Sequence, residues 1–93
     1  MTAMSWQTAV IRRRPGVVEA PFDDVLVVLN EDLEYLGLDE VGQRIWEILD
    51  EPRTLNSLVA TLLDEYDVPR ADCERDVTAF LDALEERKLV ARA

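Results

Sequence analysis

The sequence contains no histidine and only one cysteine, Cys73, among its 93 residues. Without histidine, the chain cannot by itself form a Ser-His or Cys-His nucleophilic system or a histidine-ligated metal site. A single cysteine excludes an internal disulfide. Because Cys73 falls on an apolar helical stripe with only Arg75 as a nearby cation, we predict a buried structural thiol and not an activated one.

Motifs that orient phosphates, metals or cofactors are also missing. The sequence has no GxGxxG or P-loop, no CxxC or HExxH pair and no EF-hand loop. Its clustered carboxylates are better explained as charged turns and helix caps than as ligands of a hard cation; these are Asp23/Asp24, Glu31/Asp32/Glu34 and Asp39/Glu40. We therefore predict a binding protein with no catalytic residue, no metal and no cofactor.

The first residues lack the apolar segment of a secretion signal, and no apolar run reaches membrane-spanning length. These two absences predict a cytoplasmic protein without a membrane partner.

Basic residues are scarce outside one cluster. The net charge is −10, from 20 acidic and 10 basic residues, and Arg12, Arg13 and Arg14 are the only charged side chains before Glu19. Nucleic-acid binding depends on neutralising phosphates, so an acidic body without a basic stripe suits a basic peptide better than a nucleic acid. Acidity that only keeps the protein soluble explains the same charges.

The length allows one small domain. Residues 1–14, MTAMSWQTAVIRRR, lack periodicity, and we interpret them as an N-terminal arm or edge segment. The domain itself is expected over residues 15–93, beginning at the turn signal Pro15-Gly16.

Three strands are predicted in the first half of the domain: Val17–Ala20, Val25–Leu29 and Leu33–Leu38. The turn residues Asn30-Glu31-Asp32 reverse the chain between the last two, which gives an antiparallel meander. The run VLVVL is apolar on both faces. It is therefore placed in the middle of the sheet, covered by helices on one side and by something else on the other. At least one sheet edge lacks a partner strand within the chain.

Three helices are predicted to follow. Asp39 caps the first, with the apolar positions Val41, Ile45, Ile48 and Leu49 and with Trp46 buried beside them. Gly42 offers a place where another backbone can approach. Thr54 caps the second helix, and the third runs from near Ala71 to near Lys88 with one apolar stripe: Cys73, Val77, Phe80, Leu81 and Leu84.

This order predicts an α+β fold like a winged helix-turn-helix, with a three-stranded antiparallel sheet followed by three helices. Such a fold can serve a DNA-binding regulator whose last helix enters the major groove. The start of the third helix, however, carries Asp72, Glu74, Arg75 and Asp76, whereas a DNA reader needs cations or amides.

One flank of the third helix carries small and acidic side chains: Asp72, Asp76, Ala79 and Ala83. If the open third strand lies beside this flank, an extended peptide can add as a fourth strand. Apolar pockets near Leu33, Tyr35 and Phe80 would then hold its side chains, and Asp72 and Asp76 would face a basic residue. An ordinary solvated flank and a protected edge remain the alternative.

Several segments resemble a known family; they are Arg14-Pro15-Gly16-Val17-Val18, Tyr35-Leu36-Gly37-Leu38 running into Asp39-Glu40-Val41-Gly42-Gln43-Arg44-Ile45-Trp46, Leu49-Asp50-Glu51-Pro52 with Thr54, Tyr66-Asp67-Val68, Asp76-Val77, Phe80-Leu81 and Leu89-Val90. On these segments, residues 10–92 resemble the PqqD-like proteins, the RiPP recognition elements that bind leader peptides of ribosomally made natural products. Asp39 stands where many members have Asn, which preserves the helix cap.

The resemblance implies that a leader peptide adds antiparallel to the third strand and packs against the third helix. Carried over position by position, it implies peptide contacts at Asp32, Leu33, Glu34, Tyr35 and Leu36 on the strand side, and at Asp72, Asp76, Ala79, Phe80 and Ala83 on the helix.

Small stand-alone members serve lasso peptide biosynthesis. We therefore expect the partners to be a precursor leader peptide, a separate leader peptidase and possibly a cyclase, with the chain itself a monomer or weak dimer. Other relatives are peptide chaperones for radical-SAM maturases, and that role stays open beside the DNA-binding regulator.

Overall fold

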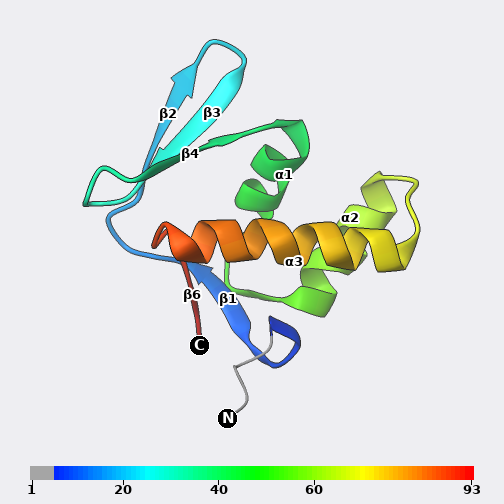
Figure 1. Cartoon of the computed structure of the whole chain (residues 1–93). Helices are drawn as coiled ribbons and strands as arrows, with labels where there is room; N and C mark the ends of the chain where they lie inside the picture. Colours follow the sequence, from blue (N-terminus) through cyan, green and yellow to red (C-terminus); the bar gives the residue numbers. More distant parts are fainter. Residues whose placement is uncertain (1–5) are drawn as a thin grey trace.

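The computed structural model describes residues 6–93 (Figure 1). A short 3₁₀ helix, η1 (Trp6–Thr8), and β1 (Val10–Arg13) precede the strands β2 (Val18–Phe22), β3 (Val25–Leu29) and β4 (Tyr35–Leu38). The chain continues through α1 (Glu40–Ile48), β5 (Arg53–Thr54), α2 (Leu55–Glu65), α3 (Arg70–Glu86) and β6 (Val90–Arg92). The predicted α+β class, with a three-stranded antiparallel sheet followed by three helices, is confirmed.

The first sheet has the order β2-β3-β4, and both pairings are antiparallel. The central place predicted for the VLVVL strand is confirmed. Val28 on β3 and Leu38 on β4 are buried in the hydrophobic core and lie on the same face of the sheet, since side chains alternate between the two faces of a strand. The prediction that the first strand ends at Ala20 is wrong, because Pro21 and Phe22 also belong to β2. Pro21 is tolerated there because β2 is an edge strand.

The helix caps follow the sequence signals. Asp39 accepts a hydrogen bond from the Gly42 amide at 2.7 Å, and Thr54 accepts one from the Ser57 amide at 3.1 Å. These caps satisfy backbone donors at the start of α1 and α2. The prediction for Val41 is wrong: its side chain is 44% exposed and does not join the buried face of α1.

A second sheet, with the order β5-β1-β6, was not predicted. We expected an arm over residues 1–14, yet β1 is the central strand of this sheet, and Ile11 within it is fully buried. The strand has only four residues and its partners lie far along the chain, so no local periodicity announces it. Residues 1–5 of the expected arm lie outside the described part of the chain.

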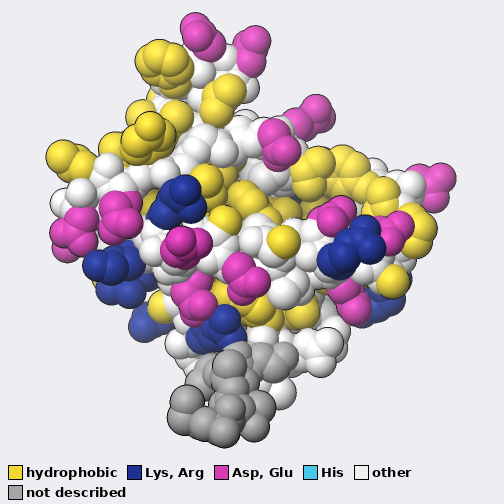
Figure 2. All heavy atoms as spheres, in the orientation of Figure 1, with side chains coloured by type: hydrophobic (Ala, Val, Ile, Leu, Met, Phe, Trp, Pro, Cys, Tyr) yellow, Lys and Arg dark blue, Asp and Glu magenta, His cyan; other side chains and the backbone are white. Residues whose placement is uncertain are grey.

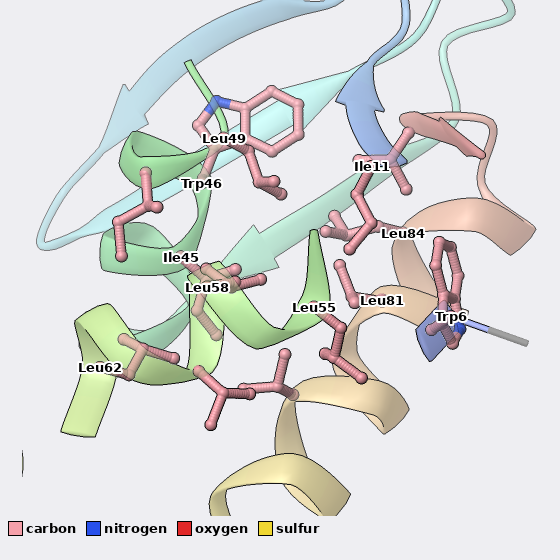
Figure 3. Packing of buried hydrophobic residues seen from close by; sticks show 14 of the residues in the cluster. Trp6, Ile11, Ile45, Trp46, Leu49, Leu55, Leu58, Leu62, Leu81 and Leu84 are labelled. Atoms are coloured by element: carbon pink, nitrogen blue, oxygen red, sulfur yellow. The ribbon is translucent and has the colours of Figure 1, made fainter. Parts of the chain in front are cut away.

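The hydrophobic core lies between the two sheets and the three helices, and Figure 3 shows side chains from α1, α2, α3 and β1 meeting there. The predicted burial of Trp46 is confirmed; its indole Nε1 donates to Glu19 Oε1 at 2.7 Å, and Arg13 stacks on its ring. Trp6, which the sequence did not place, is buried with its Nε1 bonded to Asp82 Oδ1.

Within residues 6–93, no helix combines the length and the apolar character that crossing a membrane requires.

Candidate functional site

The site begins with the edge of the first sheet. β4 pairs with β3 on one side only, and Figure 1 shows its other side turned toward α3. In the described chain no further strand pairs with β4. The backbone N–H and C=O groups along that side can therefore take an added strand.

Asn30 fixes the start of β4 against the end of α3. Its side chain is buried, and its Nδ2 donates to the Arg87 carbonyl at 2.6 Å. Its Oδ1 accepts from the amides of Asp32 at 2.8 Å and Glu34 at 3.0 Å. Asp32 also pairs with Lys88 at 3.6 Å, between exposed side chains. These contacts hold the turn and prevent β4 from drifting away from α3.

The other end of β4 meets α3 through a ring contact. A Cβ added at Gly42, in the first turn of α1, would lie 3.1 Å from Phe80 Cζ. We expected a backbone to approach Gly42, and that expectation is wrong, because the neighbour is the Phe80 ring. Since β4 begins near Arg87 and leads into α1 beside Phe80, it runs antiparallel to the second half of α3.

A pocket of about 400 Å³ opens where α1, the end of α2 and α3 meet. Its wall is mostly apolar, and Figure 2 shows hydrophobic side chains gathered along the upper side of α3. Its lining residues are Asp39, Val41, Gly42, Ile45, Leu62, Tyr66, Val68, Cys73, Asp76, Val77 and Phe80.

The structure divides the predicted helix contacts into two groups. Asp76 and Phe80 line the pocket. Asp72, Ala79 and Ala83 do not line the pocket. They nevertheless lie on the same face of α3 as Asp76, because successive members of the series 72, 76, 79 and 83 are three or four residues apart. Ala79 is exposed and Ala83 half-buried, so the face beside β4 carries little side-chain bulk.

The predicted strand contacts also fall into two groups. Tyr35 and Leu36 lie on β4, where Tyr35 is 64% exposed and Leu36 packs against the core. Asp32, Leu33 and Glu34 lie in the turn before β4 and outside the pocket. Leu33 has a φ of 64° and is 75% exposed. A bulky residue in this left-handed region is strained, and the hydrogen bonds of Asn30 hold it there.

Carboxylates supply the charge around the pocket. Asp39 accepts the hydrogen bond of its cap, whereas the Asp76 side chain is 78% exposed and forms an ion pair with Arg75 at 3.7 Å. Asp72 pairs with the same arginine at 3.1 Å. One arginine thus serves two carboxylates, which leaves excess negative charge at the pocket mouth.

Cys73 forms part of the pocket floor. Burial raises the pKa of its thiol, and the carboxylates of Asp76 and Glu74 act in the same direction against Arg70. A thiol that resists ionisation is a weak nucleophile. Its burial agrees with the predicted structural role.

Sequence reasoning missed several site residues. Asn30 was interpreted only as a turn former, and Tyr66 and Val68 were named only as part of the family resemblance. In the structure Asn30 holds the start of β4, and Tyr66 and Val68 line the pocket. The aromatic and β-branched residues at the break between α2 and α3 could have indicated these pocket positions. Among residues 6–93, no group of three or more Cys, Asp or Glu side chains is arranged to hold a metal ion.

Comparison with known proteins gives one family and two similar structures. The family described as "Coenzyme PQQ synthesis protein D (PqqD)" matches residues 26–90. No curated protein gives a significant match.

The first structure is "TbiB1 in Complex with the TbiA(beta) Leader Peptide". It is 39% identical to this chain with a TM-score of 0.75, and the match covers 85% of this chain and 93% of that one. The second is "Lasso peptide synthetase B1 complexed with the leader peptide", at 29% identity and a TM-score of 0.74, covering 87% of this chain and 96% of that one.

Proposed function

The chain belongs to the PqqD family, and we propose that it binds the leader peptide of a ribosomally synthesised precursor, of the kind found in lasso peptide biosynthesis. The observation that carries this proposal is the unpaired edge of β4 beside α3, in a chain similar over most of its length to two leader-peptide complexes. Such an edge gives affinity through main-chain hydrogen bonds, which do not depend on the peptide's side chains.

In the proposed mode the leader adds antiparallel to β4 and lies against α3. Asp32 to Leu36 contact it along the strand, and Asp72, Asp76, Ala79, Phe80 and Ala83 contact it from the helix. The small side chains at positions 79 and 83 leave room for a backbone, which supports this path.

Specificity comes from side chains that leave the added strand toward the pocket. The pocket combines an apolar wall with the exposed carboxylate of Asp76. It suits an apolar anchor followed by a basic residue, because a buried apolar side chain supplies most of the free energy and an exposed charge pair adds less.

The role is recognition and not bond formation. Holding the leader raises the local concentration of the precursor at a second protein, as tethering does in general. The proposed second proteins are a separate leader peptidase and a cyclase, with the chain acting as a monomer or weak dimer. The similarity to a lasso peptide synthetase B1 structure favours this role over service to a radical-SAM maturase.

A DNA-binding role is disfavoured by the charges on α3. The two cations near its start are already paired with acidic neighbours, Arg70 with Glu74 at 3.2 Å and Arg75 with Asp72 at 3.1 Å. Phosphate contacts would have to replace those pairs in a chain of net charge −10.

The proposal is tested by titrating the protein into a fluorescent leader peptide encoded beside it and following anisotropy. A scrambled leader and a fluorescent duplex DNA serve as controls. Binding of the leader alone is the expected result. Binding of the duplex with a steep salt dependence would instead establish the regulator, and equal binding of leader and scramble would exclude sequence recognition.

A further inference from the structure

Three arginine side chains of this acidic protein have no carboxylate partner within residues 6–93: Arg12, Arg14 and Arg87. Of the other seven basic residues, Arg53 donates to Ser57, and six form ion pairs with acidic side chains; these six are Arg13, Arg44, Arg70, Arg75, Lys88 and Arg92. The chain has 20 acidic and 10 basic residues, so an arginine without a carboxylate is the exception. The three guanidinium groups can therefore bind a carboxylate from outside.

These arginines gather at one end of the molecule, where α3 finishes and β6 begins. Arg12 lies on β1, which pairs with β6, and the Arg14 amide donates to the Leu89 carbonyl at 3.0 Å. Arg87 is the C-cap of α3, and Lys88 follows it. Figure 2 shows Lys and Arg side chains gathered on this side of the molecule. We call Arg12, Arg14, Arg87 and Lys88 the basic corner; Arg87 is half-buried and the other three are exposed.

The basic corner adjoins the start of β4. The turn before β4 is joined to Arg87 by a hydrogen bond from Asn30 at 2.6 Å and to Lys88 by an ion pair at 3.6 Å. Leu33 in this turn has a φ of 64°, so the extended backbone of β4 begins only after it, at Tyr35. In the proposed mode the leader runs antiparallel to β4. The C-terminal end of the added strand therefore lies at Tyr35, and the segment that follows it leaves the sheet beside the basic corner.

The turn before β4 carries three carboxylates, and each of them has a neighbour of its own. Asp32 pairs with Lys88, and Glu34 accepts a hydrogen bond from Asn30 at 3.2 Å. The Glu31 side chain lies against the backbone of the turn between β1 and β2. None of these carboxylates forms an ion pair with an arginine within residues 6–93. The arginines of the basic corner thus keep their charge unpaired beside an acidic turn.

The two ends of the proposed groove carry opposite charges. At the far end the exposed carboxylate of Asp76 lies at the pocket mouth. At the near end lies the basic corner. The edge of a sheet can take an added strand in either direction, since parallel and antiparallel ladders both form. A leader that is basic before the strand and acidic after it meets opposite charges only in the antiparallel direction. The reverse direction would bring like charges together, which costs free energy.

We propose that the basic corner binds acidic side chains in the precursor segment that follows the added strand, and that it thereby fixes the direction of the leader on β4. The inference rests on the proposed function for its ligand. Guanidinium groups bind carboxylates through paired hydrogen bonds, which makes arginine suited to this contact. An extended chain advances about 3.3 Å per residue, so acids within the first few residues after the strand pass the corner. A nucleic acid would need a longer basic surface, in a chain whose net charge is −10.

The test crosses two variants of the full chain with three peptides. One variant combines Arg14→Gln and Lys88→Gln, and the matched control is Arg70→Gln, an exposed arginine at the opposite end of α3. The peptides are fluorescent forms of the leader encoded beside the chain, with Glu, Gln or Lys in the stretch after the residues that an alanine scan finds essential. At low salt we expect wild type and control to bind the Glu form about tenfold more tightly than the Lys form. The double variant should lose most of this preference.

The direction of the leader is tested by disulfide cross-linking. Cys73→Ala removes the native thiol, and Lys88→Cys then supplies the only one in the chain. Leaders with one cysteine before or after the essential residues are offered to this variant, and a melt checks that it folds. We expect a cross-link to the cysteine after those residues only. A cross-link to the cysteine before them overturns the proposal, because the leader would then run in the other direction.

The two proposals fail in different ways. If wild type binds none of the three leaders, the proposed function is wrong and the inference falls with it. If wild type binds the Glu and Lys forms equally well, only the inference is wrong. The same holds if the double variant weakens all three forms alike, since the substitutions would then act through the turn and not through charge. Duplex DNA that binds wild type but not the double variant would assign the corner to nucleic acid instead.

Discussion

The two sheets of this protein share a core but differ in how completely their edges and faces are covered. In β5-β1-β6 the central strand is covered on both edges by partners of two and three residues, which leave little edge to pair with. In β2-β3-β4 no further strand pairs with β4 within residues 6–93, and Val18, Phe22, Val25 and Tyr35, on the sheet face that points away from the core, are exposed. One sheet is closed by the fold, and the other is left open.

Side-chain interactions also stabilise the closed sheet, β5-β1-β6. Arg13 stacks on Trp46 at 4.4 Å and donates to its carbonyl, while Arg92 stacks on Trp6 at 3.8 Å and pairs with Glu85 at 2.8 Å. Cations on aromatic rings with carboxylate partners are rigid arrangements. From this difference we expect stability to depend more on the β5-β1-β6 sheet and the proposed leader binding more on the β2-β3-β4 sheet.

The largest effect should come from destabilising the β5-β1-β6 sheet. Ile11→Ala removes a fully buried side chain from β1, and such truncations cost about 2–5 kcal/mol in unfolding free energy. Natural domains have only about 5–15 kcal/mol to lose. Urea unfolding followed by circular dichroism measures the change. Val10→Ala, next to it and exposed, is the control and should cost about 0.5 kcal/mol or less.

Truncating exposed side chains of the β2-β3-β4 sheet should weaken leader binding more than it lowers the stability of the fold. Tyr35→Ala, at an exposed position of β4, is expected to weaken leader binding by about tenfold, or 1.4 kcal/mol, with an unchanged melting temperature. Phe80→Ala is expected to lose at least as much affinity, but its ring also packs on Gly42, so a melt must accompany the titration. Wild-type affinity in folded variants of both would contradict the proposed groove.

A charge change at the pocket mouth should have a smaller effect. Asp76→Lys replaces an exposed carboxylate and is expected to weaken the binding of a basic leader by a few-fold. This loss of affinity should become smaller as salt is added. Anisotropy titrations at low and high ionic strength give the comparison, with Asp64→Lys as an exposed acid outside the pocket. Equal affinities for wild type and Asp76→Lys at low salt would mean that Asp76 is only a solvated charge.

The smallest effect concerns a pair that belongs to neither sheet. Hydrogen bonds from Arg44, at 2.6 and 2.7 Å, hold the pKa of Glu65 below its ordinary value. The pair therefore stabilises the fold at neutral pH. That contribution is lost as pH falls below the ordinary carboxyl range and through the lowered pKa of the folded state.

Glu65→Gln should lower the melting temperature at pH 7 by no more than a few degrees, because the pair is exposed. The difference from wild type should disappear in acid, where both side chains are neutral. A difference that persists at low pH would assign the effect to packing instead of charge.

Much of the fold could be predicted from the sequence. The middle strand, the caps at Asp39 and Thr54 and the burial of Trp46 depend on patterns within a few residues, which local chemistry decides. The edge beside α3 followed from the order of elements and from the family resemblance. The positions of Asp32, Leu33 and Glu34 could not be predicted, because these residues fall in a turn whose shape depends on the hydrogen bond from Asn30 to the Arg87 carbonyl.

The sequence by itself determined the α+β class, the antiparallel meander, the three helices and the lack of histidine chemistry, since each depends on composition or on short periodic patterns. Only the tertiary structure decided that residues 10–13 form the centre of a second sheet and that Gly42 receives the Phe80 ring. It also decided that an apolar sheet face stays open. The physical reason for the second sheet and for the Gly42–Phe80 contact is distance along the chain: they join residues 38 to 81 positions apart, and no local preference specifies such a meeting.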